Sequence, residues 1–247
     1  MKNLLQFKLK ILFLILMLIP LLGISQTKNV VATSRVFPKV DKQLEFEKVL
    51  ASHSQKYHTG DVKWRVFQIQ SGPDAGGFQI SEGPKSWQSE DARGDINVEH
   101  NNDWHKNVTI YLTDRNSHAY SVYIDSLSTV AIGDYSDKIQ VTHLYPKLGC
   151  SYRVATMLKS LKAAWAADGS TVVVYEANGS GAPQYILVRR YKQGLKEKED
   201  GFRKPFVDTY EKIHGKGSWG IFNDNIKEYV TDQWSELLFY RADLSSK

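Results

Sequence analysis

The stretch Val36-Phe37-Pro38-Lys39-Val40 is matched 108 residues later by Leu144-Tyr145-Pro146-Lys147-Leu148. An internal repeat decides how every later element is interpreted, so this match is the starting point for the fold prediction. The similarity continues at the same shift through five positions with the spacing i, i+3, i+4, i+7 and i+11, which is one face of a helix. These positions are Phe46, Val49, Leu50, His53 and Tyr57 in the first copy and Val154, Met157, Leu158, Leu161 and Trp165 in the second.

The remainder of each copy alternates in the same order. Residues 62–70 and 171–177 are predicted strands that run into glycine-rich turns, and a second strand of each hairpin follows. A helical segment and a final strand, over 118–124 and 236–241, end each copy. The order strand, helix, two-stranded hairpin, helical segment and strand is that of the split βαβ, or ferredoxin-like, unit. We therefore predict an α+β chain with two ferredoxin-like repeats, residues 28–134 and 135–247.

This duplication, over residues 28–245, resembles the dimeric α+β barrel superfamily, which includes NIPSNAP-like and antibiotic-biosynthesis monooxygenase-like proteins. The resemblance implies a pseudo-dimeric α+β barrel within one chain and a small-ligand site between sheet and helices. Burial of one sheet against the other removes apolar area at about 25 cal/mol per Å². Six residues are the predicted contributors to that burial: Phe78, Ile80, Tyr185, Leu187, Leu237 and Phe239.

The N-terminus has the pattern of a secretory signal peptide. Lys2, Lys8 and Lys10 precede an apolar run over residues 11–22 and then Gly23-Ile24-Ser25. We predict a signal peptide over residues 1–25, cleavage after Ser25, and a periplasmic or secreted protein without stable membrane insertion. The single cysteine, Cys150, allows no internal disulfide and does not stand at a lipoprotein cleavage point.

Charge argues against a nucleic-acid partner. Three of the 32 Lys and Arg residues lie in the leader, which leaves 29 basic against 27 acidic side chains and a net charge of +2. A nucleic-acid-binding domain is expected to carry a strong basic patch.

Four residues are candidate ligand-binding residues. His53 and Tyr57 lie on the apolar face of the first predicted helix, where the second copy has Leu161 and Trp165. Because leucine and tryptophan would close that face, a small-molecule site between sheet and helix is expected in the first copy. The alternative is a core histidine with one hydrogen-bond partner.

Arg35 and His143 complete the candidate set. They occupy equivalent places in the first strand of each copy, so both should face the same side of their sheets. They are expected to mark either a polar cavity at the centre of the pseudo-dimer or a solvated rim.

Other polar clusters are assigned no role. The segment Glu99-His100-Asn101-Asn102-Asp103-Trp104-His105 has metal-binding residue types but no established zinc spacing, so no metal ligand is predicted. Arg189-Arg190-Tyr191-Lys192 could hold acidic groups or be a solvated turn. No catalytic residue and no cofactor is assigned.

Three functions follow as hypotheses. The leading one is an exported small-molecule-binding protein. The alternatives are a cofactor-independent monooxygenase or haem-handling enzyme, which the resemblance implies, and an envelope interaction protein. An enzyme would need a water-excluding pocket with convergent polar groups.

Overall fold

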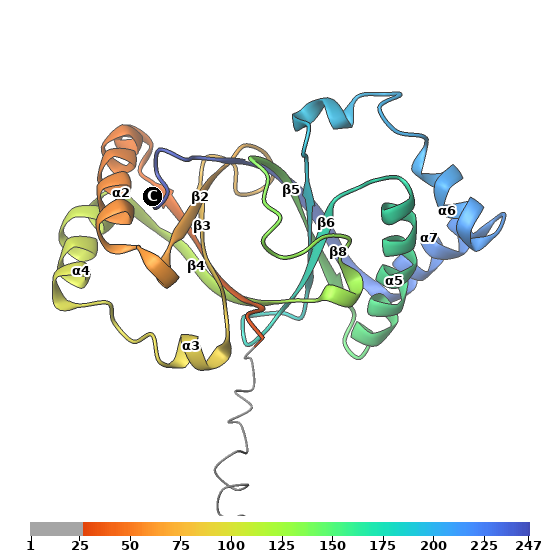
Figure 1. Cartoon of the computed structure of the whole chain (residues 1–247), viewed down its shortest axis with the longest axis horizontal. Coiled ribbons are helices and arrows are strands. Elements are labelled where there is room, and N and C mark those ends of the chain that lie inside the picture. The colour runs from red at the N-terminus through yellow and green to blue at the C-terminus, as the bar shows by residue number, and fades with distance from the viewer. Residues whose placement is uncertain (1–26) are drawn as a thin grey trace, which may run out of the picture.

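The computed structural model of the chain describes residues 27–247, so the predicted signal peptide lies outside the described residues. Eight antiparallel strands form a closed barrel, with helices on two opposite sides (Figure 1). Among the described residues, no helix is long and apolar enough to cross a membrane. The first repeat consists of β1 (Val30–Pro38), α2 (Gln43–Tyr57), β2 (Trp64–Ile69), β3 (Phe78–Lys85), α3 (Trp87–Asp91), α4 (Val98–Asp103) and β4 (Leu112–Tyr123).

The second repeat has the same order of elements. It consists of β5 (Lys138–Pro146), α5 (Ser151–Ala167), β6 (Val172–Ala177), β7 (Tyr185–Arg190), α6 (Phe206–His214), α7 (Ser218–Tyr229) and β8 (Val230–Tyr240). The barrel order is β1-β3-β2-β8-β5-β7-β6-β4, with β4 paired to β1. Each repeat therefore contributes a four-stranded ferredoxin-like sheet, and the predicted tandem α+β barrel is confirmed.

The helices cover the outer faces of the two sheets, as the repeated apolar spacing predicts. Phe46 and Leu50 of α2 are fully buried in a cluster with Phe78 of β3. Val154 and Leu158 of α5 pack in an equivalent cluster of the second repeat. Figure 1 shows α2, α3 and α4 on one side of the barrel and α5, α6 and α7 on the other.

The two repeats exchange the segments that follow their last strands. Leu127, after β4, lies in the apolar cluster of the second repeat, and Leu244, after β8, lies in that of the first. Hydrogen bonds also join each exchanged segment to a strand of the other repeat. Val174 N donates to Ser128 Oγ and Val66 N donates to Ser245 Oγ, both at 2.9 Å. Each core is thus completed by the other repeat.

The face predicted for the β3 and β7 residues was wrong. Phe78 and Tyr185 pack against the helices outside the barrel, while the alternate residues, Gln79 and Ile186, face the interior. Successive side chains alternate between the two faces of the sheet as predicted, but the apolar ones in these hairpins face the helices and not the barrel interior. Inside the barrel, the apolar wall includes Leu238, which packs with Phe67, Ile69, Ile139 and Val141.

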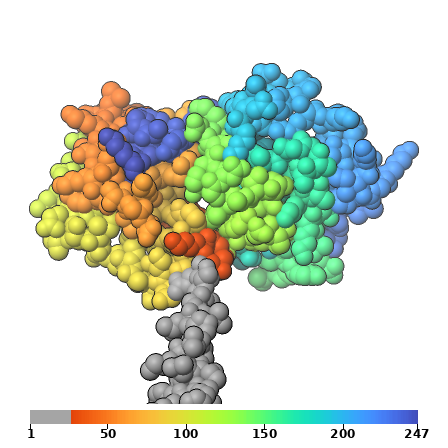
Figure 2. Space-filling view, viewed as in Figure 1, coloured from red at the N-terminus to blue at the C-terminus, as the bar shows by residue number. Residues whose placement is uncertain are grey.

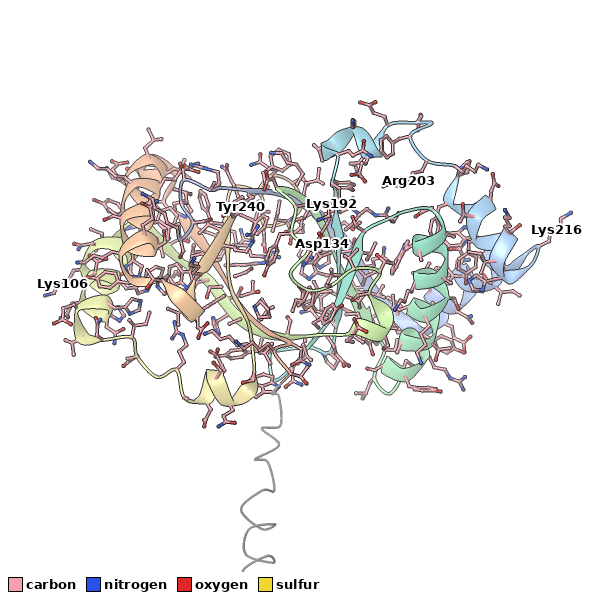
Figure 3. The ribbon with its side chains drawn as sticks, viewed as in Figure 1. Lys106, Asp134, Lys192, Arg203, Lys216 and Tyr240 are labelled. Atoms are coloured by element: carbon pink, nitrogen blue, oxygen red, sulfur yellow. The ribbon has the colours of Figure 1, made fainter. Side chains whose placement is uncertain are left out.

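One segment joins the repeats and lies across the middle of the molecule. This connecting segment, residues 128–137, is the green region between the two repeats in Figure 2. Arg190 of β7 donates hydrogen bonds to the carbonyl oxygens of Ala131, Ile132 and Asp134. Lys192 forms an ion pair with Asp134, and the two side chains meet near the centre of Figure 3. The segment is therefore fixed to the end of β7.

Candidate functional site

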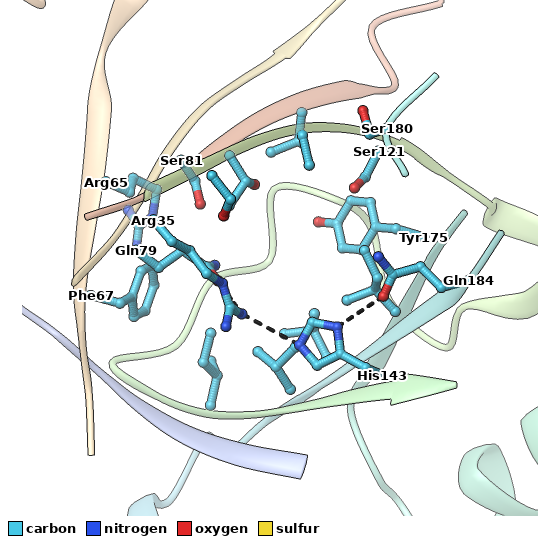
Figure 4. A pocket seen from close by; sticks show the side chains of 18 of the residues that line it. Arg35, Arg65, Phe67, Gln79, Ser81, Ser121, His143, Tyr175, Ser180 and Gln184 are labelled. Carbon is cyan, nitrogen blue, oxygen red and sulfur yellow. Dashed lines mark hydrogen bonds between the residues drawn. The ribbon is translucent and has the colours of Figure 1, made fainter. Parts of the chain in front are cut away.

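The barrel contains a cavity of about 420 Å³, within the size range of small-molecule sites. Its side chains come from strands of both repeats and from the connecting segment (Figure 4). One wall is apolar and includes Phe67, Ile139 and Val188. Other parts of the wall carry hydroxyl, amide and guanidinium groups. The cavity therefore combines an apolar surface with hydrogen-bond donors.

Arg35 and His143 meet inside this barrel, in the polar cavity that was one of the two places expected for them. The guanidinium Nη2 of Arg35 lies 3.3 Å from Nε2 of His143, and Gln184 Oε1 lies 3.0 Å from His143 Nδ1 (Figure 4). Both residues are buried, with 9% and 7% of their surface exposed. The ring of His143 stacks on Trp234 at 3.9 Å between ring centroids. Their position is internal, although a role in ligand binding stays a prediction.

A buried carboxylate balances this pair. Glu236 of β8 is 1% exposed, accepts two hydrogen bonds from Arg35 and lies 3.1 Å from His143 Nε2. Asp74 Oδ2 accepts a further bond from Arg35 at 2.5 Å. Burial lowers the pKa of Arg35, but the bonds and charges of Glu236 and Asp74 outweigh it and raise that pKa above its ordinary value. Arg35 is therefore a paired cation within the barrel wall.

Gly72 lets the β2–β3 hairpin approach Glu236 closely. Its φ of +88° is in the region that favours glycine, and a Cβ there would lie 3.0 Å from Cβ of Glu236. A larger residue at this position would push the hairpin away from the buried carboxylate.

Arg65 lines the cavity and has no acidic partner among the described residues. Its guanidinium carbon lies 3.9 Å from the ring centroid of Tyr135 and 4.4 Å from that of Tyr240. Its Nε is buried without a hydrogen-bond partner in the part of the chain that the structure describes. Aromatic rings thus hold the side chain in place, while its terminal Nη groups have no hydrogen-bond acceptor among the described residues.

Arg190 brings a second cation to the same ring. Its guanidinium carbon lies 5.3 Å from the centroid of Tyr135. The guanidinium donates hydrogen bonds to carbonyl oxygens and to the hydroxyl of Tyr175. Burial raises the pKa of Tyr175 to about 12, so its phenol keeps its proton at neutral pH and can donate it in a hydrogen bond. Arg65 and Tyr175 present donors to the cavity, and Arg190, whose terminal N–H groups are already bonded, adds a positive charge.

His53 and Tyr57 lie elsewhere, on the outer side of the first sheet. His53 belongs to α2 and is 1% exposed. Its ring centroid lies 5.1 Å from that of Tyr57. Burial lowers the pKa of His53 to about 4, despite the bond to Asp103, so the ring is neutral at pH 7. The four candidate residues therefore occupy two separate places.

A second cavity, of about 310 Å³, lies between sheet and helices in the second repeat. Leu161 and Trp165 line it, so the expectation that these residues close that face was wrong. Leu161 also packs against Tyr210 and Phe222 of the outer helices, so its apolar surface is shared between two layers. Arg189 faces this cavity, whereas its neighbour Arg190 faces the barrel.

Several residues of the barrel cavity had no sequence signal. Arg65 lies in a predicted strand but belongs to no motif, and Tyr135 lies in the segment between the repeats. Only the closure of the barrel places them together. His58 and His100, which lie beside His53, were likewise not assigned.

Comparisons with known proteins agree with this architecture. The sequence matches no protein-family model and no curated protein. Among solved structures, an anthrone oxidase-like protein is similar with a TM-score of 0.51 at 12% identity, over 87% of this chain and 92% of that chain. A mutant chlorite dismutase from Candidatus Nitrospira defluvii is similar with a TM-score of 0.51 at 6% identity, over 89% of this chain and 94% of that chain. At these identities the likeness establishes the fold.

Proposed function

We propose that this chain, which has the fold of the dimeric α+β barrel superfamily, binds a small organic anion inside its barrel. The observation that carries the proposal is Arg65. A guanidinium that lines a 420 Å³ cavity without an acidic partner among the described residues favours a ligand that supplies one. Carboxylates and phenolates are the groups of matching charge and geometry.

The rest of the cavity supports an anion with an apolar body. Tyr175 provides a further donor and Arg190 a further positive charge near Tyr135. Phe67, Ile139 and several aliphatic side chains make another part of the wall apolar. Desolvation of an apolar ring or chain against such a wall contributes to affinity. We infer that an aromatic or short aliphatic carboxylate fits best.

Binding rather than turnover is proposed, because fold likeness alone carries no activity to this chain. The haem-handling alternative also finds no matching donor set in the cavity between sheet and helices. Protein ligands of haem iron are histidine, cysteine, tyrosine or methionine paired with histidine. The cavity between sheet and helices is lined by Met157, with no histidine, cysteine or tyrosine among its described residues.

Replacement of Arg65 by methionine tests the proposal. The parent protein should be stabilised by one or more members of a panel that pairs carboxylates with their amides, such as benzoate with benzamide and indole-3-acetate with indole-3-acetamide. At a ligand concentration of about 100 Kd, the gain in unfolding free energy is about 2.7 kcal/mol. Arg65→Met should lose most of that gain, because the charged partner is gone. Thermal unfolding with and without each compound measures it.

The matched control is Arg189→Met, which removes a single arginine from the other cavity. It should keep the carboxylate-induced shift of the parent protein. A shift that vanishes in Arg189→Met and persists in Arg65→Met would place the site between sheet and helices. Equal shifts with each acid and its amide would contradict an anionic ligand.

We also propose that the protein acts outside the cytoplasm, because residues 1–25 have the composition of a signal peptide. Intact-mass spectrometry of the protein from separated cell fractions tests this. A mature species that begins at Gln26 is expected in the periplasm or medium. A full-length or lipid-modified form would refute the proposal.

A further inference from the structure

Three histidines converge on the outer side of the first sheet. His53 lies on α2, His58 immediately follows that helix, and His100 lies on α4. Each offers a ring nitrogen, and these three atoms all lie within 4.8 Å of one another. The distances between ring centroids are 4.8, 5.1 and 5.3 Å, so the rings form a nearly even triangle.

The other nitrogen of each ring points away from the triangle to an acceptor. Nδ1 of His53 lies 2.7 Å from Asp103 Oδ2, and Nδ1 of His58 lies 3.1 Å from the carbonyl oxygen of Val62. Nδ1 of His100 lies 2.9 Å from Asn101 Oδ1. A carboxylate and a carbonyl only accept hydrogen bonds, so Nδ1 of both His53 and His58 must carry a proton.

This tautomer leaves lone pairs at the centre of the triangle. Nε2 of His53 is buried and has no hydrogen-bond partner among the described residues. Nε2 of His58 and Nε2 of His100 lie 3.2 Å apart. Two ligand nitrogens on a tetrahedral zinc ion, each about 2.0–2.1 Å from it, are separated by about 3.3 Å. The His58–His100 pair therefore has the spacing of two ligands to a common ion, and the ligand nitrogen of His53 lies within 4.8 Å of both.

We propose that His53, His58 and His100 bind a divalent transition-metal ion through their Nε2 atoms, with Zn²⁺ as the best match. Imidazole suits zinc, copper, nickel and iron, and three histidines form a known catalytic zinc donor set. Asp103 and the Val62 carbonyl take the place of the outer partners that orient metal-bound histidines. Three protein ligands leave a fourth position for water or another donor.

The surroundings hold the histidines in this arrangement before any ion arrives. The ring of Trp64 stacks on His58 at 3.3 Å between centroids, and Trp104 lies 5.2 Å from His53. The second repeat has no counterpart, because Leu161 and Ala166 stand where the first has His53 and His58. The site is thus a specialisation of one copy, separate from the barrel cavity.

Metal titration of the purified, untagged protein tests the proposal. After removal of metal with a chelator, the protein should take up one Zn²⁺ per chain in competition with a chromophoric chelator, and Co²⁺ should give the visible bands of a low-coordinate nitrogen site. His100→Gln should abolish stoichiometric binding. Asp103→Asn, which keeps all three ligands, should weaken binding by about 10–100-fold.

The matched control is His105→Gln, because His105 is an exposed histidine five residues from His100 and outside the triangle. This variant should bind Zn²⁺ like the parent protein. Equal affinity of His100→Gln and His105→Gln would overturn the proposal. Circular dichroism checks that each variant folds. Absence of saturable one-to-one binding to the parent protein would overturn it without reference to any variant.

Discussion

The fragment of residues 28–134, produced alone, should not give a folded monomer. Both of its outer strands pair with the second repeat in the intact chain, β2 with β8 and β4 with β6. Its apolar cluster also loses Leu244, which comes from the end of the chain and is 2% exposed. Two unpaired edges and an incomplete core favour association with another copy or aggregation.

Size-exclusion chromatography with light scattering and thermal melts measure this, with the intact chain as the control. The intact chain should be monodisperse and unfold in one transition. The fragment should appear as aggregate or as a self-associated species that rebuilds the barrel from two first repeats. A fragment that remains monomeric at high concentration and melts cooperatively would contradict the exchange of segments as a requirement for folding.

Replacement of Arg35 by methionine should lower the free energy of unfolding by about 3–5 kcal/mol. The change leaves Glu236, whose side chain is fully buried, without its cationic partner in the barrel wall. Removal of one member of a buried ion pair is costly because the remaining charge is uncompensated. Arg35→Met combined with Glu236→Leu should recover a large part of the loss, because it removes the stranded carboxylate as well. Urea denaturation of the parent, single and double variants provides the values.

Arg115→Met is the control for this prediction. Arg115 also forms an ion pair with Asp74, but its side chain is 54% exposed. Exposed pairs contribute at most about 1 kcal/mol. If Arg35→Met were no more destabilising than Arg115→Met, the buried network would not stabilise the barrel as described here.

The architecture was predictable because the two copies have the same elements in the same order, offset by 108 residues. The shift that aligns Val36 with Leu144 also aligns Arg35 with His143, so their position on the same side of the two sheets could be anticipated, whereas their contact could not. Helix periodicity identified α2 and α5 for the same reason. The face of the β3 and β7 residues could not be fixed, since alternation specifies two faces without saying which one the helices cover.

The cavity residues were harder to predict from the sequence because segments far apart in the sequence close the barrel. Arg65 and Tyr135 are 70 positions apart, one in the first repeat and the other in the connecting segment, so no local pattern joins them. The grouping of His53 with His58 and His100 was missed for a similar reason. His100 lies in a stretch without strong periodicity, and only the packing of α4 beneath α2 brings it to His53 and His58.

The most direct test of anion binding in the barrel is a crystal soaked with a brominated form of the carboxylate that stabilises the protein most. The account predicts an anomalous bromine peak inside the barrel, beside the apolar wall of Phe67 and Ile139, with the carboxylate directed to Arg65. A bromine peak in the cavity beneath α5, or on the outer surface alone, would contradict it.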